Sequence, residues 1–162
     1  MHPLRQVKCL AAIGVAVLFL GTPRLLADSG PSANGHGNIT VAGELRTFSF
    51  TAVTQKDGSV TGEAQLDNRA QGVRLHLVIN CLVVTGNVAK VSGIVTKVTG
   101  PTIIQVGWPS IFYVNDNGEG SNSPPDTISL VFSFDPSVTV DCRTPFVLDM
   151  LAIDDGNIQV KP

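Results

Sequence analysis

The residues of this chain best suited to chemistry are oxygen donors gathered in one short segment. Asp116, Asn117 and Glu119 lie close together among glycines, and Asp126 follows them. Calcium takes about six to eight oxygen ligands from carboxylates, amides and carbonyls, and an exported protein meets this ion at high concentration. The segment is therefore a candidate calcium site. Its spacing differs from that of the EF-hand loop, and Asp-Asn-Gly is also an ordinary turn, so a purely structural turn is the alternative.

A second candidate site is the aromatic group Trp108, Phe112 and Tyr113, which flanks Pro109. Aromatic rings that are exposed near the acidic segment could stack on a sugar, because each ring offers a wide, flat apolar face. The group is a candidate ligand-binding site on that ground. The alternative is that the rings close one end of a β core.

Catalytic motifs are missing from the sequence. It holds no Gly-x-Ser-x-Gly, no His-Glu-x-x-His, no Cys-x-x-Cys and no glycine-rich phosphate loop. His76 shares the more polar face of an expected strand with Arg74 and Asn80. A general base needs an orienting acid and a nucleophile within hydrogen-bond reach, and nothing in the sequence nominates them. We expect a non-catalytic protein with no cofactor unless calcium binds.

The first 27 residues have the order of a secretory leader. Arg5 and Lys8 come first, an unbroken apolar run spans residues 9–20, and Ala27 offers a cleavage site. The run would reach only about 18 Å as a helix, short of a hydrocarbon core of ~30 Å. We predict a signal peptide over residues 1–27 and a protein that is secreted, on the cell surface or in the periplasm, with no membrane span after processing. A buried N-terminal helix is the alternative.

Cysteine usage agrees with export. Only Cys81 and Cys142 follow the leader, and two cysteines can pair completely. A disulfide between them would persist in an oxidising compartment and would close a long loop, which stabilises the fold by about 4 kcal/mol in the chain-entropy model. Two buried thiols are the alternative.

The charge balance after the leader argues against nucleic acid as a partner. Residues 28–162 carry eight lysines and arginines and thirteen aspartates and glutamates, a net charge of −5. Nucleic-acid binding needs clustered basic side chains, and no polybasic segment suggests anionic lipid either. The partner we expect is an extracellular protein or glycan.

Composition predicts strands rather than helices. Residues 28–162 contain 18 Val, 12 Thr and 9 Ile, against three Glu, and β-branched side chains suit a pleated surface. Apolar and polar residues alternate over 47–52, 59–66 and 127–134, while residues 73–84 are apolar enough for a central strand. The inward residues so predicted are Phe48, Phe50, Ala52, Val60, Ala64, Leu66, Val73, Leu75, Leu77, Ile79, Cys81, Ile128, Leu130, Phe132 and Phe134. Large and small side chains mix in this set, which predicts a packed interior rather than a hollow one.

An internal echo indicates how the sheet closes. GNITV at 37–41 and GNIQV at 156–160 stand near the two ends of the domain, and pairing between them would remove two exposed edges. Chance recurrence of a common string is the alternative. We predict a flexible lead-in over 28–36 and one all-β domain over 37–162, an antiparallel meander of about 8–10 strands closed as a barrel or a flattened sandwich.

Several of these segments together carry a family resemblance. The segments are GNITVAG at 37–43, TFSF at 47–50, GSVTG at 58–62, VRLH at 73–76, GNVA at 86–89, FYVNDNGE at 112–119 and GNIQV at 156–160. In this order they resemble the post-COAP-1 domain of secreted and cell-surface bacterial proteins. Members often carry Pro after the Glu of the NDNGE turn, where Gly120 stands here. The resemblance implies an exported bacterial β domain and transfers no catalytic residue.

These observations lead to an exported, non-catalytic β domain that serves as an extracellular binding or structural accessory module. A small-ligand carrier is the first alternative, because a barrel can hold a pocket. An enzyme of unknown class is the second. A large apolar cavity would favour the carrier, and a cleft with converging titratable groups would favour the enzyme.

Overall fold

The computed structural model of the protein describes residues 30–120 and 122–162. The predicted signal peptide, residues 1–27, lies outside the described residues. The first strand begins at Ser32, inside the segment expected to be a flexible lead-in. Residues 32–36 are ordered there because they pair with a neighbouring strand on each side.

The described residues form ten strands and no helix. Accordingly, no helix long and apolar enough to cross a membrane occurs among them. The strands are β1 (Ser32–Val41), β2 (Glu44–Thr54), β3 (Val60–Asn68), β4 (Val73–Thr85), β5 (Val88–Thr99), β6 (Pro109–Asn115), β7 (Thr127–Ser129), β8 (Phe132–Ser133), β9 (Met150–Ala152) and β10 (Asp155–Lys161). The all-β prediction is confirmed.

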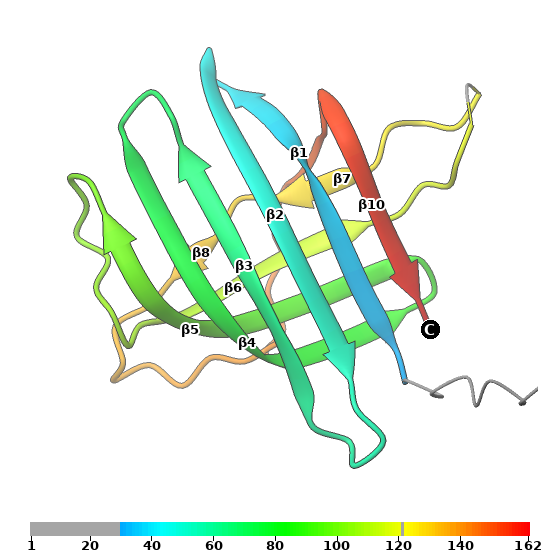
Figure 1. The fold of residues 1–162 in the computed structure, drawn as a ribbon, viewed down its shortest axis with the longest axis horizontal. Helices are drawn as coiled ribbons and strands as arrows, with labels where there is room; N and C mark the ends of the chain where they lie inside the picture. The colour runs from blue at the N-terminus through cyan, green and yellow to red at the C-terminus, as the bar shows by residue number, and fades with distance from the viewer. Residues whose placement is uncertain (1–29, 121) are drawn as a thin grey trace, which may run out of the picture.

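One curled sheet holds all the strands. Its order is β10-β1-β2-β3-β4-β5-β6-β7-β9, with β8 paired to β6, and every pairing is antiparallel. In Figure 1 the strands β10, β1, β2 and β3 lie side by side in front, and β6 and β7 pass behind them at a steep angle. The long strands β4 and β5 curve from one layer to the other. The predicted meander is thus a half-barrel.

The strands that carry the two echoed segments pair as the sequence predicts, although the segments themselves meet only at their glycines. The pairing does not close the sheet, because β10 remains one of its edge strands. In the antiparallel ladder between β1 and β10, Gly37 lies opposite Gly156. A Cβ on Gly37 would lie 2.3 Å from the carbonyl oxygen of Asp155, and a Cβ on Gly156 would lie 2.1 Å from that of His36. Glycine is therefore required at both positions for the two backbones to approach this closely.

The interior is filled by side chains from both layers. Phe48, Phe50 and Ala52 of β2 are buried in one inward row, and Leu75, Leu77 and Ile79 of β4 form another. The ring of Phe50 meets that of Phe112 edge to face, with centroids 5.3 Å apart. Fully buried aliphatic side chains from β5, β6, β7 and β10 complete the same cluster: Val91, Val95, Val114, Ile128 and Ile158.

Two register shifts let β4 bend between the layers. They fall between His76 and Leu77 and between Ile79 and Cys81, and bulges of this kind increase local twist and re-aim the following side chains. Leu82, opposite Val91, faces the core. Cys81 therefore points to the outer face, because neighbouring residues of a strand alternate. The prediction that Cys81 shares the face of Ile79 is wrong for this reason.

The predicted strand over 127–134 is also interrupted. Ile128 lies opposite Val114, but Phe132 lies opposite Ile111, so β7 and β8 are offset by one residue along β6. One extra residue moves the following side chains to the other face. Phe132 is consequently 44% exposed instead of buried, and Phe134 leaves the sheet to stack on Phe146 with centroids 5.3 Å apart.

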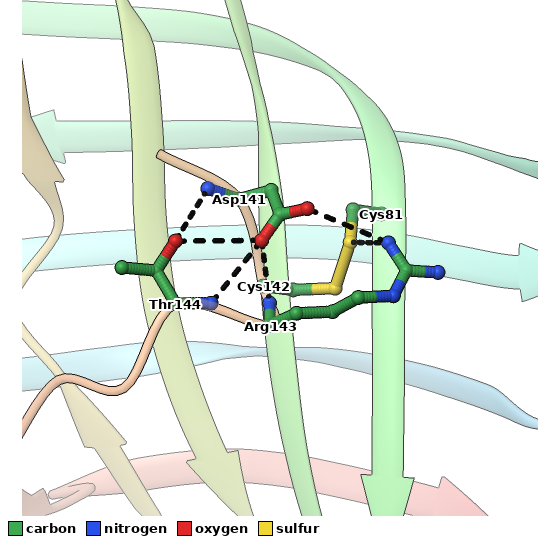
Figure 2. The surroundings of a disulfide bond; sticks show 5 residues. All are labelled: Cys81, Asp141, Cys142, Arg143 and Thr144. Carbon is green, nitrogen blue, oxygen red and sulfur yellow. Dashed lines mark hydrogen bonds and ion pairs between the residues drawn. A yellow bond between two sulfur atoms is a disulfide. The ribbon is translucent and has the colours of Figure 1, made fainter. Parts of the chain in front are cut away.

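A long connection without regular structure, residues 134–149, joins β8 to β9; we call it the strap. Its Cys142 forms the predicted disulfide with Cys81 of β4, with Cα atoms 5.7 Å apart. Figure 2 shows the strap turn at this bond, where the carboxylate of Asp141 accepts hydrogen bonds from the backbone N–H groups of Arg143 and Thr144. The guanidinium of Arg143 lies 3.3 Å from the Cys81 sulfur. The disulfide thus fastens the strap to the outer face of the half-barrel.

Candidate functional site

The acidic segment lies between β6 and β7, beside the outer edge of β10. Asp126 is only 6% exposed, and its carboxylate accepts a hydrogen bond from the backbone N–H of Asn117 at 2.8 Å and another from that of Ile158 at 2.7 Å. The first bond closes the loop on itself. The second bond attaches the loop to β10.

Asp116 repeats this arrangement one step along β10. Its carboxylate accepts hydrogen bonds from the backbone N–H groups of Gly118 at 2.9 Å and Val160 at 3.0 Å. Ile158 and Val160 are two residues apart, so their N–H groups point to the same side of the strand. Together Asp116 and Asp126 accept hydrogen bonds from two backbone N–H groups on the free edge of β10. In a closed barrel, a neighbouring strand would pair with these groups instead. We call this contact between the 116–126 loop and β10 the seam.

The other two predicted calcium ligands also have structural partners at the seam. The side-chain amide of Asn117 donates to the carbonyl of Pro125 at 2.7 Å, and the carboxylate of Glu119 accepts from the side-chain amide of Asn157 at 3.0 Å. Within the described ranges, no three His, Cys, Asp or Glu side chains are grouped so that they could hold a metal ion. Calcium binding stays a prediction, and the ion would have to compete with these backbone and amide donors.

The aromatic group does not form one surface. Phe112 is fully buried in the core, whereas Tyr113, the next residue of β6, lies on the outer face, donates its hydroxyl to the carbonyl of Phe146 at 3.4 Å and has Lys90 over its ring. Trp108 is half-buried against the core. The strand alternation that separates Phe112 from Tyr113 is the reason the three rings cannot stack on one sugar. They act instead as packing residues on two faces.

His76 lies on the outer face of β4. In the sheet register it stands between Gln65 of β3 and Lys97 of β5. A shallow, largely polar depression crosses this part of the sheet and includes Glu63 and Thr51. The position is the one predicted from the sequence, a histidine on the polar face of a central strand.

Carboxylates with a shifted pKa occur in surface turns. Hydrogen bonds from Ser59, chiefly its hydroxyl, lower the pKa of Asp57. The backbone N–H of Ser137 does the same for Asp135. In the strap, the backbone N–H of Arg143 is the main cause of the lowered pKa of Asp141. Each of these carboxylates caps a turn, so the shifts report local structure.

A cleft of about 200 Å³ opens at the end of the half-barrel where the β1–β2 and β3–β4 turns lie. We call this end the mouth. The floor and walls of the cleft are mainly apolar, and the lining comes from five strands and three connecting segments. The apolar lining residues include Ile39, Phe48, Leu66, Val73, Leu75 and Ile128.

Polar side chains gather at the mouth above this apolar floor. Arg46 lines the cleft and lies opposite Ile39 and Asn68 in the sheet. Glu44 receives hydrogen bonds from Asn68 at 3.1 Å and, more weakly, from Gln71 at 3.4 Å. The Nε of Arg46 is buried and has no hydrogen-bond acceptor among the described residues. The mouth therefore combines an apolar cleft with an unused buried donor.

The sequence holds a signal for this site, although the signal is not a motif. Phe48 and Phe50 were predicted to point inward, and the same alternation continued toward the N-terminus places Arg46 on that inward face. A charged residue at the end of an inward row is unusual, because charged side chains are rarely buried unless paired. The cleft itself could not be predicted, since it depends on how the 100–108 and 130–131 segments meet β2 and β4.

Comparison of the chain with models of protein families, with curated proteins and with solved structures finds no match. The site is therefore interpreted from its own geometry.

Proposed function

We propose that this protein is an exported, non-catalytic binding module whose binding site is the cleft at the mouth. The observation that carries the proposal is the cleft itself, a space of about 200 Å³ with apolar walls and a polar rim. Binding sites for small molecules have this composition, apolar walls with a few placed polar groups. In the acidic segment and the aromatic group, in contrast, the side chains form hydrogen bonds and packing contacts within the fold.

The size of the cleft limits what it can take. Pockets for drug-sized ligands measure roughly 300–1,000 Å³, and the mouth cleft is smaller, at about 200 Å³. The rest of the interior is packed by the core cluster. We therefore propose that the module receives a short apolar chain or a small apolar group. A large ligand enclosed at the barrel centre, as a carrier would hold it, does not suit this interior.

Export is proposed on two supports. The order of basic, apolar and small residues over 1–27 is that of a signal peptide, and the Cys81–Cys142 bond is of a kind that persists in oxidising compartments. The resemblance of several segments to the post-COAP-1 domain agrees with an exported bacterial protein.

A cleft-filling variant tests the proposed function. Val73 lines the cleft, and Val78 stands on the opposite face of the same strand, 52% exposed. We expect 1-octanol to bind the protein and to shift the amide NMR signals of the cleft residues. Val73→Phe should weaken this binding at least about tenfold because the added ring fills the space, whereas Val78→Phe should leave it unchanged. Equal binding by both variants, or no binding by the unaltered protein, would contradict the proposal.

A further inference from the structure

Arg46 is the inward-facing charge of β2. The inward row of this strand runs Ala52, Phe50, Phe48 and then Arg46, so the guanidinium ends an apolar row at the mouth. Its side chain is 29% exposed, and its Nε–H is buried without an acceptor. A buried donor without a partner costs free energy in the free protein. A bound acceptor would remove that cost.

The acidic side chains around Arg46 leave this donor open. Glu44 contacts Arg46 only through Nη2, at 3.5 Å, and its carboxylate also accepts from Asn68. Asp67, which borders the cleft, is bound to Arg74 at 2.6 Å. Because each of these two acids has another partner, the Nε–H of the Arg46 guanidinium remains free to donate a hydrogen bond at the mouth.

We propose that the cleft binds a short amphipathic carboxylate, with its chain on the apolar floor and its carboxylate on Arg46. This inference rests on the proposed function and names the ligand class for the same site. A guanidinium presents a planar fork that matches both oxygens of a carboxylate. A volume of about 200 Å³ equals that of about seven water molecules at ~30 Å³ each, which suits a chain of about six to eight carbons.

The net charge of the protein separates a local preference for a carboxylate from a general attraction of anions. Residues 28–162 carry a net charge of −5, so the protein as a whole repels anions. An anion that binds more tightly than a neutral molecule of the same length must therefore meet a local positive group. At this cleft the local group is Arg46.

The test compares octanoate with 1-octanol by calorimetric titration on the unaltered protein and on two variants. Arg46→Gln removes the proposed partner of the carboxylate. Arg69→Gln removes the same charge from an exposed position in the neighbouring β3–β4 turn, outside the cleft lining. We expect octanoate to bind the unaltered protein at least tenfold more tightly than octanol. Arg46→Gln should reduce octanoate affinity to that of octanol, and Arg69→Gln should change the affinity for neither molecule.

Two results would overturn the inference. Octanoate binding no tighter than octanol in the unaltered protein would show that the mouth does not read the carboxylate, and this comparison holds even if Arg46→Gln fails to fold. Equal losses in the Arg46 and Arg69 variants would assign the preference to general charge. If octanol binds in either case, the proposed function stands while the ligand class fails; if neither molecule binds, both fail.

Discussion

At the seam, Asp116 and Asp126 each accept hydrogen bonds from two backbone N–H groups, whereas at the mouth Arg46 keeps its Nε–H without an acceptor. Both regions place charged side chains at a border of the same half-barrel. At the seam the hydrogen-bonding capacity of the two carboxylates is used to attach the loop to the edge of β10. At the mouth, part of the capacity of the guanidinium is left unused beside an apolar cleft.

The difference shows that a cluster of charges in a sequence does not identify a binding site by itself. The acidic segment looks the more chemical of the two, since it gathers carboxylates and amides within a few residues. Its oxygens are nevertheless opposite the free edge of β10, where unpaired backbone donors need acceptors. The single Arg46 has no such obligation to the backbone. Buried oxygens without a partner also occur beside the seam, at Asn115 and Thr127. The mouth is distinguished by a charged donor without an acceptor beside an apolar cleft.

The largest effect that tests this comparison is expected at Asp126. Asp126→Ala leaves the N–H groups of Asn117 and Ile158 without their acceptor at a site that is buried. Hydrogen bonds to charged groups contribute about 1.5–3 kcal/mol each, so we expect the free energy of unfolding to fall by at least about 3 kcal/mol in urea titrations. Asp154→Ala is the control, because its side chain is exposed in the β9–β10 corner.

The matched substitution at the mouth, Arg46→Gln, should cost little stability. Arg46→Gln removes a guanidinium that makes one weak ion pair at 3.5 Å and carries an unsatisfied donor, so we expect the free energy of unfolding to fall by no more than about 0.5 kcal/mol. The comparison between seam and mouth would break if this variant lost as much stability as Asp126→Ala.

Much of the fold could be predicted from local patterns. Alternation over 47–52 identified Phe48, Phe50 and Ala52 as core residues, and the echoed glycine strings identified the pairing of β1 with β10. Both signals are short-range properties of a strand, its period of two and its need for a close neighbour. Cys81 and Cys142 were the two cysteines left to pair, and they do.

The errors came from features that depend on the partner strand. Cys81 and Phe132 changed face because of register shifts in β4 and along β6, and a shift of one residue leaves no mark in the alternation of the strand itself. The role of Asp126 was hidden for a similar reason. The donor to this carboxylate, the N–H of Ile158, lies 32 residues away in the chain, so only the folded sheet shows that the carboxylate is occupied.

The smallest expected effect is the contribution of Asp141, in the strap, to the pH dependence of stability. The pKa of Asp141 is lowered chiefly by the backbone N–H of Arg143, so its charged form stabilises the folded state. Such a contribution is present above the unfolded-state pKa of about 4 and is lost as the pH falls through the lower folded-state pKa. We expect Asp141→Asn to make the urea midpoint slightly less dependent on pH below about pH 4. Asp149→Asn, an exposed change in the same strap, should not reproduce this, and an unchanged slope for Asp141→Asn would contradict the assignment.

The central claim is that the mouth has binding capacity, whereas the carboxylates of the seam are occupied by backbone donors. Amide NMR with two probes on one sample tests this claim most directly. Octanoate should shift the signals of mouth residues such as Leu66 and Leu75, which line the cleft. Millimolar calcium should leave the amides of Asn117, Ile158 and Val160 unshifted, because their carboxylate acceptors are already engaged. Calcium shifts at these three amides, with no octanoate shifts at the mouth, would contradict the account.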